Sequence, residues 1–264
     1  MRVFTLSVAA HAGEPGRMTM TAERLTWPAP RRLRASRPSG AWLELIAVVA
    51  LYACYSAARM LVPVDPGAAR LHATAIVHVE RLLHLDVEAA ANSWLSAHAA
   101  LALVASYWYA ALHYTVTPVV LLVLRARASR ATYRVLRNGL MAATLLAVVG
   151  YAAFPAMPPR MLGGFTDTLA QTSGSGWWGA EASAPKGMGG LTNQFAAMPS
   201  MHVGWAVWCA LAASVLLAGS RWRRLVWLYP LGTLVVVVAT ANHYLVDGIV
   251  GAALVLAVCA RMRR

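Results

Sequence analysis

Two short stretches, Met198-Pro199-Ser200-Met201-His202 and Asn242-His243-Tyr244-Leu245-Val246-Asp247, decide how this chain is organised. Each lies where a long apolar run begins, so each places a histidine at one end of a hydrophobic helix. A polar residue in that position is costly unless it faces a cavity or a partner, which makes it a functional candidate. The two stretches therefore predict one site built from the ends of two helices.

The composition around these stretches is that of a membrane protein. The 264 residues are 59% hydrophobic and 12% charged, with a mean hydropathy of +0.55, whereas a soluble domain is about half apolar and about a quarter charged. The net charge of +13 does not indicate nucleic-acid binding, because the basic residues lie between apolar runs rather than on one solvated face. The three cysteines are odd in number and lie inside apolar runs, so they predict no disulfide framework.

We predict an all-α, polytopic membrane protein with six transmembrane helices. Residues 1–40, rich in Pro, Arg, Ser and Thr, predict a disordered or surface-lying basic tail, with Met18 or Met20 as alternative start positions. The membrane domain then spans residues 41–264. Runs close to the length that crosses a bilayer, about 20 residues, are 42–62, 101–124, 136–154, 201–218, 225–240 and 243–260. Residues 70–98 mix polar and apolar positions and predict two interfacial helices split near Leu85-Asp86.

The distribution of basic residues predicts the orientation of these spans. Positive residues mark the cytoplasmic side, and most of the 23 Lys and Arg residues lie in one set of alternating connections. The other set holds only Arg59, Arg70, Arg81, Arg160 and Lys186. Both termini are therefore expected in the cytoplasm of a multi-pass cell-membrane protein, and the 155–199 connection on the extracytoplasmic side.

This topology brings Arg160, His202 and His243 to the same outer face. The N-termini of the fourth and sixth spans also point there, and a helix N-terminus binds anions through its free N–H groups and its dipole. Ser200 is placed to cap the fourth span, and Thr240 or Asn242 to cap the sixth. The expected ligand is a phosphate at the membrane surface, held by Arg160, Ser200 and Asn242.

The histidines and the carboxylate suggest phosphoryl chemistry. Within the sixth span, His243 and Asp247 are four residues apart and therefore share one helical face. A carboxylate bonded to one imidazole nitrogen fixes the tautomer and leaves the other nitrogen free to attack. His202 would protonate the departing oxygen, and Arg160 would clamp the phosphoryl oxygens. A metal site of two histidines and one carboxylate is the alternative from the residues alone.

The glycine-rich connection after Arg160 predicts a lid, because long connections of this kind are usually lids, binding loops or disorder. Within it, Asp167 is a candidate contact for an acceptor hydroxyl and Lys186 is a candidate lid residue. Trp177 and Trp178 are expected at the membrane interface. His113, inside the second span, is a candidate for lining the cavity. An external loop with no closing function is the alternative.

These motifs resemble those of the type 2 phosphatidic acid phosphatase superfamily. Residues 199–202 resemble its second motif, and His243 with Asp247 its third. The stretches 154–161, 193–198 and 239–244 look like the branch that contains inositol phosphorylceramide synthase and its bacterial, actinobacterial-type relatives. The resemblance implies a metal-independent enzyme without a cofactor, in which His243 forms a phosphohistidine, Asp247 is its partner and His202 is the acid.

The chain departs from the first and third motifs of the wider superfamily at three positions, and two of these changes remove a basic side chain that could hold the phosphate. The superfamily has a lysine where this chain has Ala153, a proline where it has Met161, and an arginine where it has Val237. The inositol phosphorylceramide synthase branch also lacks the last of these, so the departures favour the branch.

The sequence thus predicts an integral-membrane lipid phosphatase or phosphotransferase. Its substrate would be a lipid phosphoester in the bilayer. The acceptor would be water or a hydroxyl, as in the transfer of a phosphoinositol-type head group. The alternative is a non-catalytic protein that binds or transports a lipid phosphate on the same scaffold.

Overall fold

The computed structural model describes residues 65–179, 186–187 and 193–263. These residues form helices and connecting turns without a strand, apart from an isolated bridge between Ala156 and Ala196. The prediction of an all-α fold is confirmed for this part of the chain. The predicted tail at 1–40 and the predicted first span at 42–62 lie outside the described residues.

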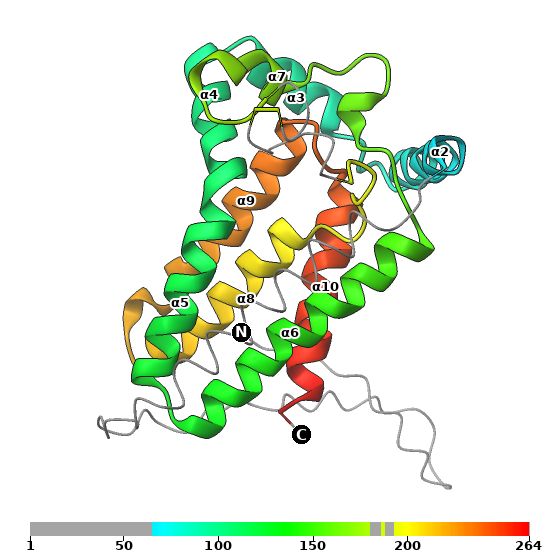
Figure 1. Cartoon of the computed structure of the whole chain (residues 1–264). Coiled ribbons are helices and arrows are strands. Elements are labelled where there is room, and N and C mark those ends of the chain that lie inside the picture. Colours follow the sequence, from blue (N-terminus) through cyan, green and yellow to red (C-terminus); the bar gives the residue numbers. More distant parts are fainter. Residues whose placement is uncertain (1–64, 180–185, 188–192, 264) are drawn as a thin grey trace, which may run out of the picture.

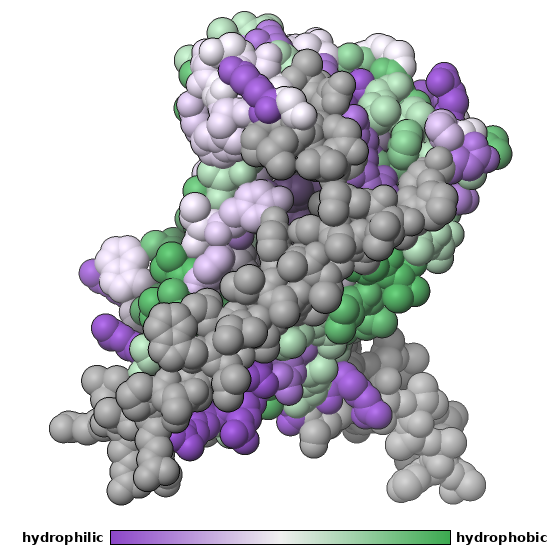
Figure 2. Space-filling model, viewed as in Figure 1, coloured by the Kyte–Doolittle hydropathy of each residue, from purple (hydrophilic) through white to green (hydrophobic). Residues whose placement is uncertain are grey.

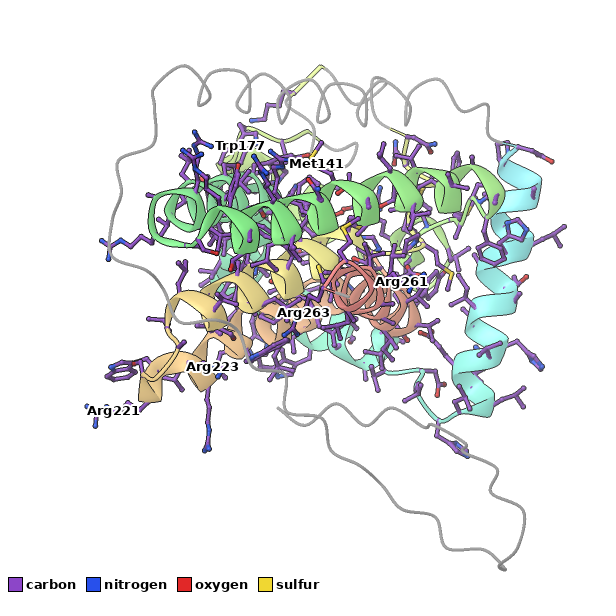
Figure 3. All side chains as sticks on the ribbon, turned by 90° about the horizontal axis from the view of Figure 1, so that it is seen from below. Met141, Trp177, Arg221, Arg223, Arg261 and Arg263 are labelled. Carbon is purple, nitrogen blue, oxygen red and sulfur yellow. The ribbon has the colours of Figure 1, made fainter. Side chains whose placement is uncertain are left out.

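Two helices precede the bundle, as the mixed polar pattern predicted: α2 (Pro66–Leu82) and α3 (Glu88–Ser96). Asp65 starts α2 by accepting the Gly67 N–H at 2.8 Å. The break between the helices contains His84 in the left-handed region, at φ 56°. Figure 1 shows α2 end-on while the bundle helices run lengthwise, and Figure 3, turned by 90°, shows α2 lengthwise and α10 end-on. The helix therefore lies across the bundle, an orientation suited to a membrane surface.

Over the described residues the bundle consists of five helical segments. A continuous helix over Ala99–Arg127 contains α4 (Ala99–Tyr107), the π-helical turn η1 (Trp108–Leu112) and α5 (His113–Arg127). The others are α6 (Arg130–Ala153), α8 (Met201–Leu216), the 3₁₀ turn η5 (Arg221–Trp227) leading into α9 (Leu228–Ala239), and α10 (Leu245–Arg261). Three helices of the described chain are long and apolar enough to cross a membrane: Ala99–Arg127, Arg130–Ala153 and Arg221–Ala239. The helix α8 is apolar but shorter.

The core of the bundle surrounds α8, most of which is buried. Its two tryptophans form hydrogen bonds to α6. Trp208 donates its Nε1–H to the Leu136 carbonyl at 2.8 Å, and Trp205 donates its Nε1–H to the Thr144 hydroxyl at 3.0 Å. The outer faces of the bundle helices are also apolar, with exposed side chains such as Leu122, Leu145, Val149, Leu231 and Val235. Figure 2 shows this apolar surface on the flank and hydrophilic residues toward both ends. A large exposed apolar surface of this kind fits a lipid environment.

The two ends of the bundle differ in what covers them. The helix α3, the short helix α7 (Thr168–Thr172) and the connection that contains it lie over one end (Figure 1). Figure 3 looks at the opposite end and labels Arg221, Arg223, Arg261 and Arg263 there. These arginines, which come from the turn η5 and from the C-terminal end of the chain, therefore lie away from the end that carries α3 and α7.

The connection between α6 and α8 is ordered by tertiary contacts over its described residues. Asn92 of α3 donates to the Thr166 and Ala239 carbonyls, both at 3.0 Å, and accepts the Thr166 N–H at 2.8 Å. Trp178 is fully buried and donates to the Leu169 carbonyl at 3.0 Å. The prediction that both tryptophans rest at the membrane interface is therefore wrong for Trp178, because its ring fills the space beside α7.

A close approach of α8 and α10 holds the two motif stretches together. The Ser200 N–H donates to the Asp247 carbonyl at 2.9 Å. A Cβ added at Gly251 would overlap the Ser200 carbonyl oxygen. Only glycine fits there, because the neighbour is backbone and cannot turn aside.

We expect Gly251→Ala to lower the stability of the folded protein by about 1–3 kcal/mol, the usual cost of overpacking. The matched control is Gly174→Ala, where an added Cβ meets no atom within 4 Å. Thermal unfolding of both variants in detergent measures the difference. A melting temperature of Gly251→Ala equal to that of the control would show that the two helices separate at no cost.

Candidate active site

His243 lies in the turn between α9 and α10 rather than on the helix. The helix begins at Leu245, with Tyr244 as its N-cap. The expectation that His243 opens the sixth span and shares a helical face with Asp247 is therefore wrong in its geometry. Ala241, in the left-handed region at φ 56°, turns the chain just before the histidine. The N–H groups of Asn242 and His243 both donate to the Val237 carbonyl at 3.1 Å, which fixes the turn on the end of α9.

The His243 ring is held by one nitrogen. Its Nδ1 lies 2.9 Å from the Ala197 carbonyl oxygen and 3.4 Å from Oδ2 of Asp247. A carbonyl oxygen only accepts, so Nδ1 carries the proton and the lone pair of the neutral ring is on Nε2. His243 is 4% exposed and Asp247 is fully buried. The arrangement leaves the Nε2 lone pair directed away from the carbonyl and the carboxylate that hold Nδ1.

Asp247 organises the backbone as well as the ring. Its Oδ2 accepts the Tyr244 N–H at 3.0 Å, while its carbonyl accepts the Ser200 N–H. Its other carboxylate oxygen, Oδ1, is buried and has no hydrogen-bond partner among the described residues. Asp247 thus joins the turn that carries His243 to the residue that precedes α8.

His202, the second residue of α8, lies beside the same ring. The centroids of the His202 and His243 rings are 5.5 Å apart. The Tyr109 ring stacks on His202 at 4.2 Å and 19°, and the His113 ring meets it edge-on at 4.2 Å. The two motif histidines therefore lie close together, and His113, the candidate for lining the cavity, contacts His202.

The π-helical turn η1 supplies the support for His202. It spans Trp108–Leu112 and brings the nearly buried Tyr109 and His113 onto the histidine. Turns of this kind are rare and are found mostly at functional sites. Tyr109 was not predicted from the sequence, because the one extra residue of a π-helical turn does not change the hydrophobic pattern of residues 101–124.

Arg160 lies in the 3₁₀ turn η2 (Pro159–Met161) and is tied to the turn before His243. Its backbone N–H donates to the Ala241 carbonyl at 2.8 Å. Its side chain is 4% exposed, with Nε 3.3 Å from Oδ2 of Asp167 and one terminal nitrogen donating to Gln194 at 3.0 Å. Asp167, expected to contact an acceptor, instead pairs with Arg160 and caps α7 by accepting the Ala170 N–H. The charge of Arg160 is thus partly neutralised by Asp167.

Ser200 and Asn242 are both buried, but neither caps a helix with its side chain. Ser200 is the N-cap residue of α8, yet its hydroxyl has no partner among the described residues. Asn242 donates to the Thr240 hydroxyl at 2.9 Å, and its Oδ1 is buried without a described partner. The predicted caps at Thr240 and Asn242 are wrong because α10 begins later. A buried polar atom without a partner is a candidate contact for a ligand.

The N-terminus of α10 is not open to an anion, contrary to the sequence-based expectation. Leu245 and Val246 donate their N–H groups to Glu88 and Glu80, both at 2.8 Å. These glutamates were predicted to lie on interfacial helices, and the structure instead buries both. Their carboxylates accept the hydrogen bonds that a phosphate would otherwise accept. Of the N-termini of α8 and α10, that of α8 is therefore the one left for an anion.

Two further expectations concern the lid and a metal. Lys186 is exposed, and the hydrogen bond described for it runs from its backbone N–H to the Trp177 carbonyl. Within the described part of the chain, no group of three His, Cys, Asp or Glu residues is arranged to hold a metal ion.

Comparison with known proteins gives one match. A family model described as the PAP2 superfamily matches residues 74–260, which include all the residues of the site described above. No curated protein and no solved structure matches the chain.

The Arg160–Asp167 pair gives a prediction for anion binding. Asp167→Asn keeps a side-chain oxygen for the Ala170 N–H but removes the charge 3.3 Å from Arg160. We expect the affinity for inorganic phosphate to rise about fivefold, because roughly 1 kcal/mol of opposing charge is lost. Isothermal titration of wild type and variant at low salt measures it. A weaker affinity would mean that Asp167 orients Arg160 instead of competing with the anion.

Proposed function

The chain belongs to the PAP2 superfamily, and from that premise we propose that it is a metal-independent, integral-membrane lipid phosphatase or phosphotransferase. The family supports a phosphatase-type enzyme, and the three long apolar helices support a place in the membrane. The substrate we propose is a lipid phosphoester, because the catalytic residues lie at one end of a bundle with an apolar outer surface. A water-soluble phosphoester would not need such a scaffold.

One observation carries the proposal: the Nδ1 of His243 faces the Ala197 carbonyl at 2.9 Å and Asp247 at 3.4 Å. This contact holds the ring in the tautomer whose Nε2 is a nucleophile. When the ring becomes a phosphorylated cation, the carbonyl dipole and the Asp247 carboxylate stabilise its positive charge.

The reaction would proceed in two displacements at phosphorus. In the first, Nε2 of His243 bonds to phosphorus while the bond to the leaving oxygen breaks, and His202 gives that oxygen its proton. In the second, the acceptor oxygen bonds to phosphorus and the P–N bond breaks, with the acceptor proton passing to His202. The 5.5 Å between the two ring centroids supports these roles.

Arg160 and Ser200 are the proposed phosphate contacts. Charge in the transition state collects on the equatorial phosphoryl oxygens, where a guanidinium and a hydroxyl donor stabilise it. The buried Ser200 hydroxyl, without a described partner, adjoins His202 in the chain. Asn242 is the third proposed contact. No metal is required, because the arginine and the N-terminus of α8 supply positive charge.

We assign the acceptor to the same site and the chain to the branch that resembles inositol phosphorylceramide synthase. The three stretches that resemble this branch meet around the site. Ala156 donates its N–H to the Phe195 carbonyl, and Arg160 donates to the Ala241 carbonyl, both at 2.8 Å. On this proposal, a second hydroxyl competes with water for the phosphohistidine, and a phosphoinositol-type head group is one transferable group.

The proposed orientation places the site outside the cytoplasm, with both termini inside. Figure 3 shows four labelled arginines at the end opposite α3 and α7. Positive residues favour the cytoplasmic side, which supports an extracytoplasmic position for the His243 end of the bundle and for its lid.

We expect purified protein to turn over labelled phospholipids or polyprenyl phosphates in the presence of EDTA, and His243→Ala to lose that activity by at least about a thousandfold, as expected for removal of a nucleophile. Rapid quenching of wild type should trap a phosphoprotein that is labile to acid and stable to base. Product masses with water alone, and with added hydroxyl acceptors, distinguish phosphatase from phosphotransferase.

His98→Ala is the control, because the His98 ring is exposed and its Nδ1 contacts only the Trp94 carbonyl among the hydrogen bonds described. It should match wild type in all three assays. Equal turnover by His243→Ala would exclude the phosphohistidine route. Lipid binding by wild type without any turnover would instead favour a protein that binds or transports the lipid.

A further inference from the structure

Three carboxylates hold the start of α10. The first N–H groups of a helix have no partner within it and must find one elsewhere. Here the Tyr244 N–H donates to Asp247 at 3.0 Å, that of Leu245 to Glu88 at 2.8 Å, and that of Val246 to Glu80 at 2.8 Å. Asp247 is local, but the two glutamates come from α3 and α2, which lie 157 and 166 residues away in the sequence.

The two glutamates are buried without a cation. Glu80 is fully buried and Glu88 is 4% exposed. Neither forms an ion pair with a described residue, and Oε2 of Glu80 is buried with no partner in that part of the chain. Two neighbouring buried carboxylates cannot both ionise at low cost. The pair therefore shares a proton, and the Glu80 oxygen that no donor reaches is where that proton is needed.

The surrounding charges favour this protonated state. Burial, above all, raises the pKa of the Glu80 carboxyl to about 8, and the nearby Glu88 and Asp247 carboxylates raise it too, against the Val246 N–H. Burial likewise raises the pKa of Glu88, with Asp247 adding to it and the Leu245 N–H opposing it. Tyr244 and His243 are further titratable side chains beside these carboxylates.

The helix start that the glutamates hold determines the geometry of the reactive ring. His243 is two residues before Leu245, and its Nδ1 contacts both Asp247 on α10 and the Ala197 carbonyl ahead of α8. A shift of α10 along its axis would move Asp247 away from the ring. Displacements of about 1 Å at a catalytic group can cost about a hundredfold in rate.

We propose that Glu80 and Glu88 form a proton-sharing clamp on the N-terminus of α10, and that they are positioning residues for the His243–Asp247 pair. The role in catalysis rests on the proposed function, whereas the shared proton does not. Below about pH 8 Glu80 holds the proton and the pair binds both N–H groups. As the pH rises through that value, Glu80 loses its proton, two charges lie beside Asp247, and the clamp loosens. Turnover falls as the pH passes about 8. The stability that this proton gives is lost earlier, between about pH 4.5, the ordinary pKa of the carboxyl, and about pH 8, because only the folded protein holds the proton in that range.

The decisive variants are Glu80→Gln and Glu80→Ala, with Asp86→Asn as the matched control. Glutamine keeps an oxygen for the Val246 N–H and an N–H for Glu88, so it mimics the protonated acid at every pH. Asp86 is an exposed carboxylate between the same two helices, and its amide removes the same charge without touching the clamp. The substrate is the lipid phosphate on which wild type turns over.

We expect Glu80→Gln to keep wild-type turnover at pH 7 and to lose the fall of kcat above about pH 8. Glu80→Ala should lower kcat about tenfold or more, with KM changed less than about threefold, since the clamp positions the nucleophile and does not contact the substrate. Asp86→Asn should follow wild type throughout. An alkaline limb that is unchanged in Glu80→Gln, or full activity in Glu80→Ala, overturns the clamp.

A second measurement separates this proposal from the proposed function. The melting temperature of His243→Ala, which is catalytically silent on our proposal, should fall between about pH 5 and 8 and level off above, and adding Glu80→Gln should remove that fall. If it does so while wild type turns over no lipid, the clamp stands and the proposed function fails. If wild type is active and the melting curves of the two variants shift alike with pH, the clamp fails alone.

Discussion

The structure depends on the backbone hydrogen bond between Ser200 and Asp247, which joins the beginnings of α8 and α10 at 2.9 Å. In an apolar environment each backbone polar group must find a partner within the protein. The ends of two hydrophobic helices therefore meet each other, and Gly251 lets them come close enough to do so. This contact brings the two histidine-bearing stretches together. The contact of the His243 ring with the Ala197 carbonyl completes the link.

Electrostatics then divides the two helix ends into different roles. Both N-termini carry partial positive charge, but α10 is neutralised by Asp247, Glu88 and Glu80. The end of α8 instead carries His202 and the buried hydroxyl of Ser200. One helix is thus fixed in place by anions of the protein, while the other is available to an anion of the substrate. The guanidinium of Arg160, shared with Asp167 and Gln194, completes the positive side of the site.

Elements that are remote in sequence from the two motif stretches take part in the site. The helices α2 and α3 supply the glutamates, and Asn92 of α3 ties the connection after Arg160 to the end of α9. The π-helical turn in the Ala99–Arg127 helix provides Tyr109 and His113 around His202. The site is therefore surrounded by supports from four parts of the chain, which fits a reaction that needs a precisely held ring more than a flexible one.

The sequence by itself determined the helical class, the split between α2 and α3, and the helices that follow, because apolar periodicity and turn residues act over a few neighbouring positions. It also singled out Arg160, His202, His243 and Asp247, which the structure brings to the same end of the bundle, since polar residues at the ends of apolar runs are conspicuous. Only the tertiary structure decided that α10 begins at Leu245, that Glu80 and Glu88 cap it, and that Tyr109 stacks on His202. These features depend on contacts between residues far apart in the chain or on a single extra residue in a helical turn. Local patterns do not encode which distant carboxylate will satisfy a helix N-terminus, because that choice is made by packing.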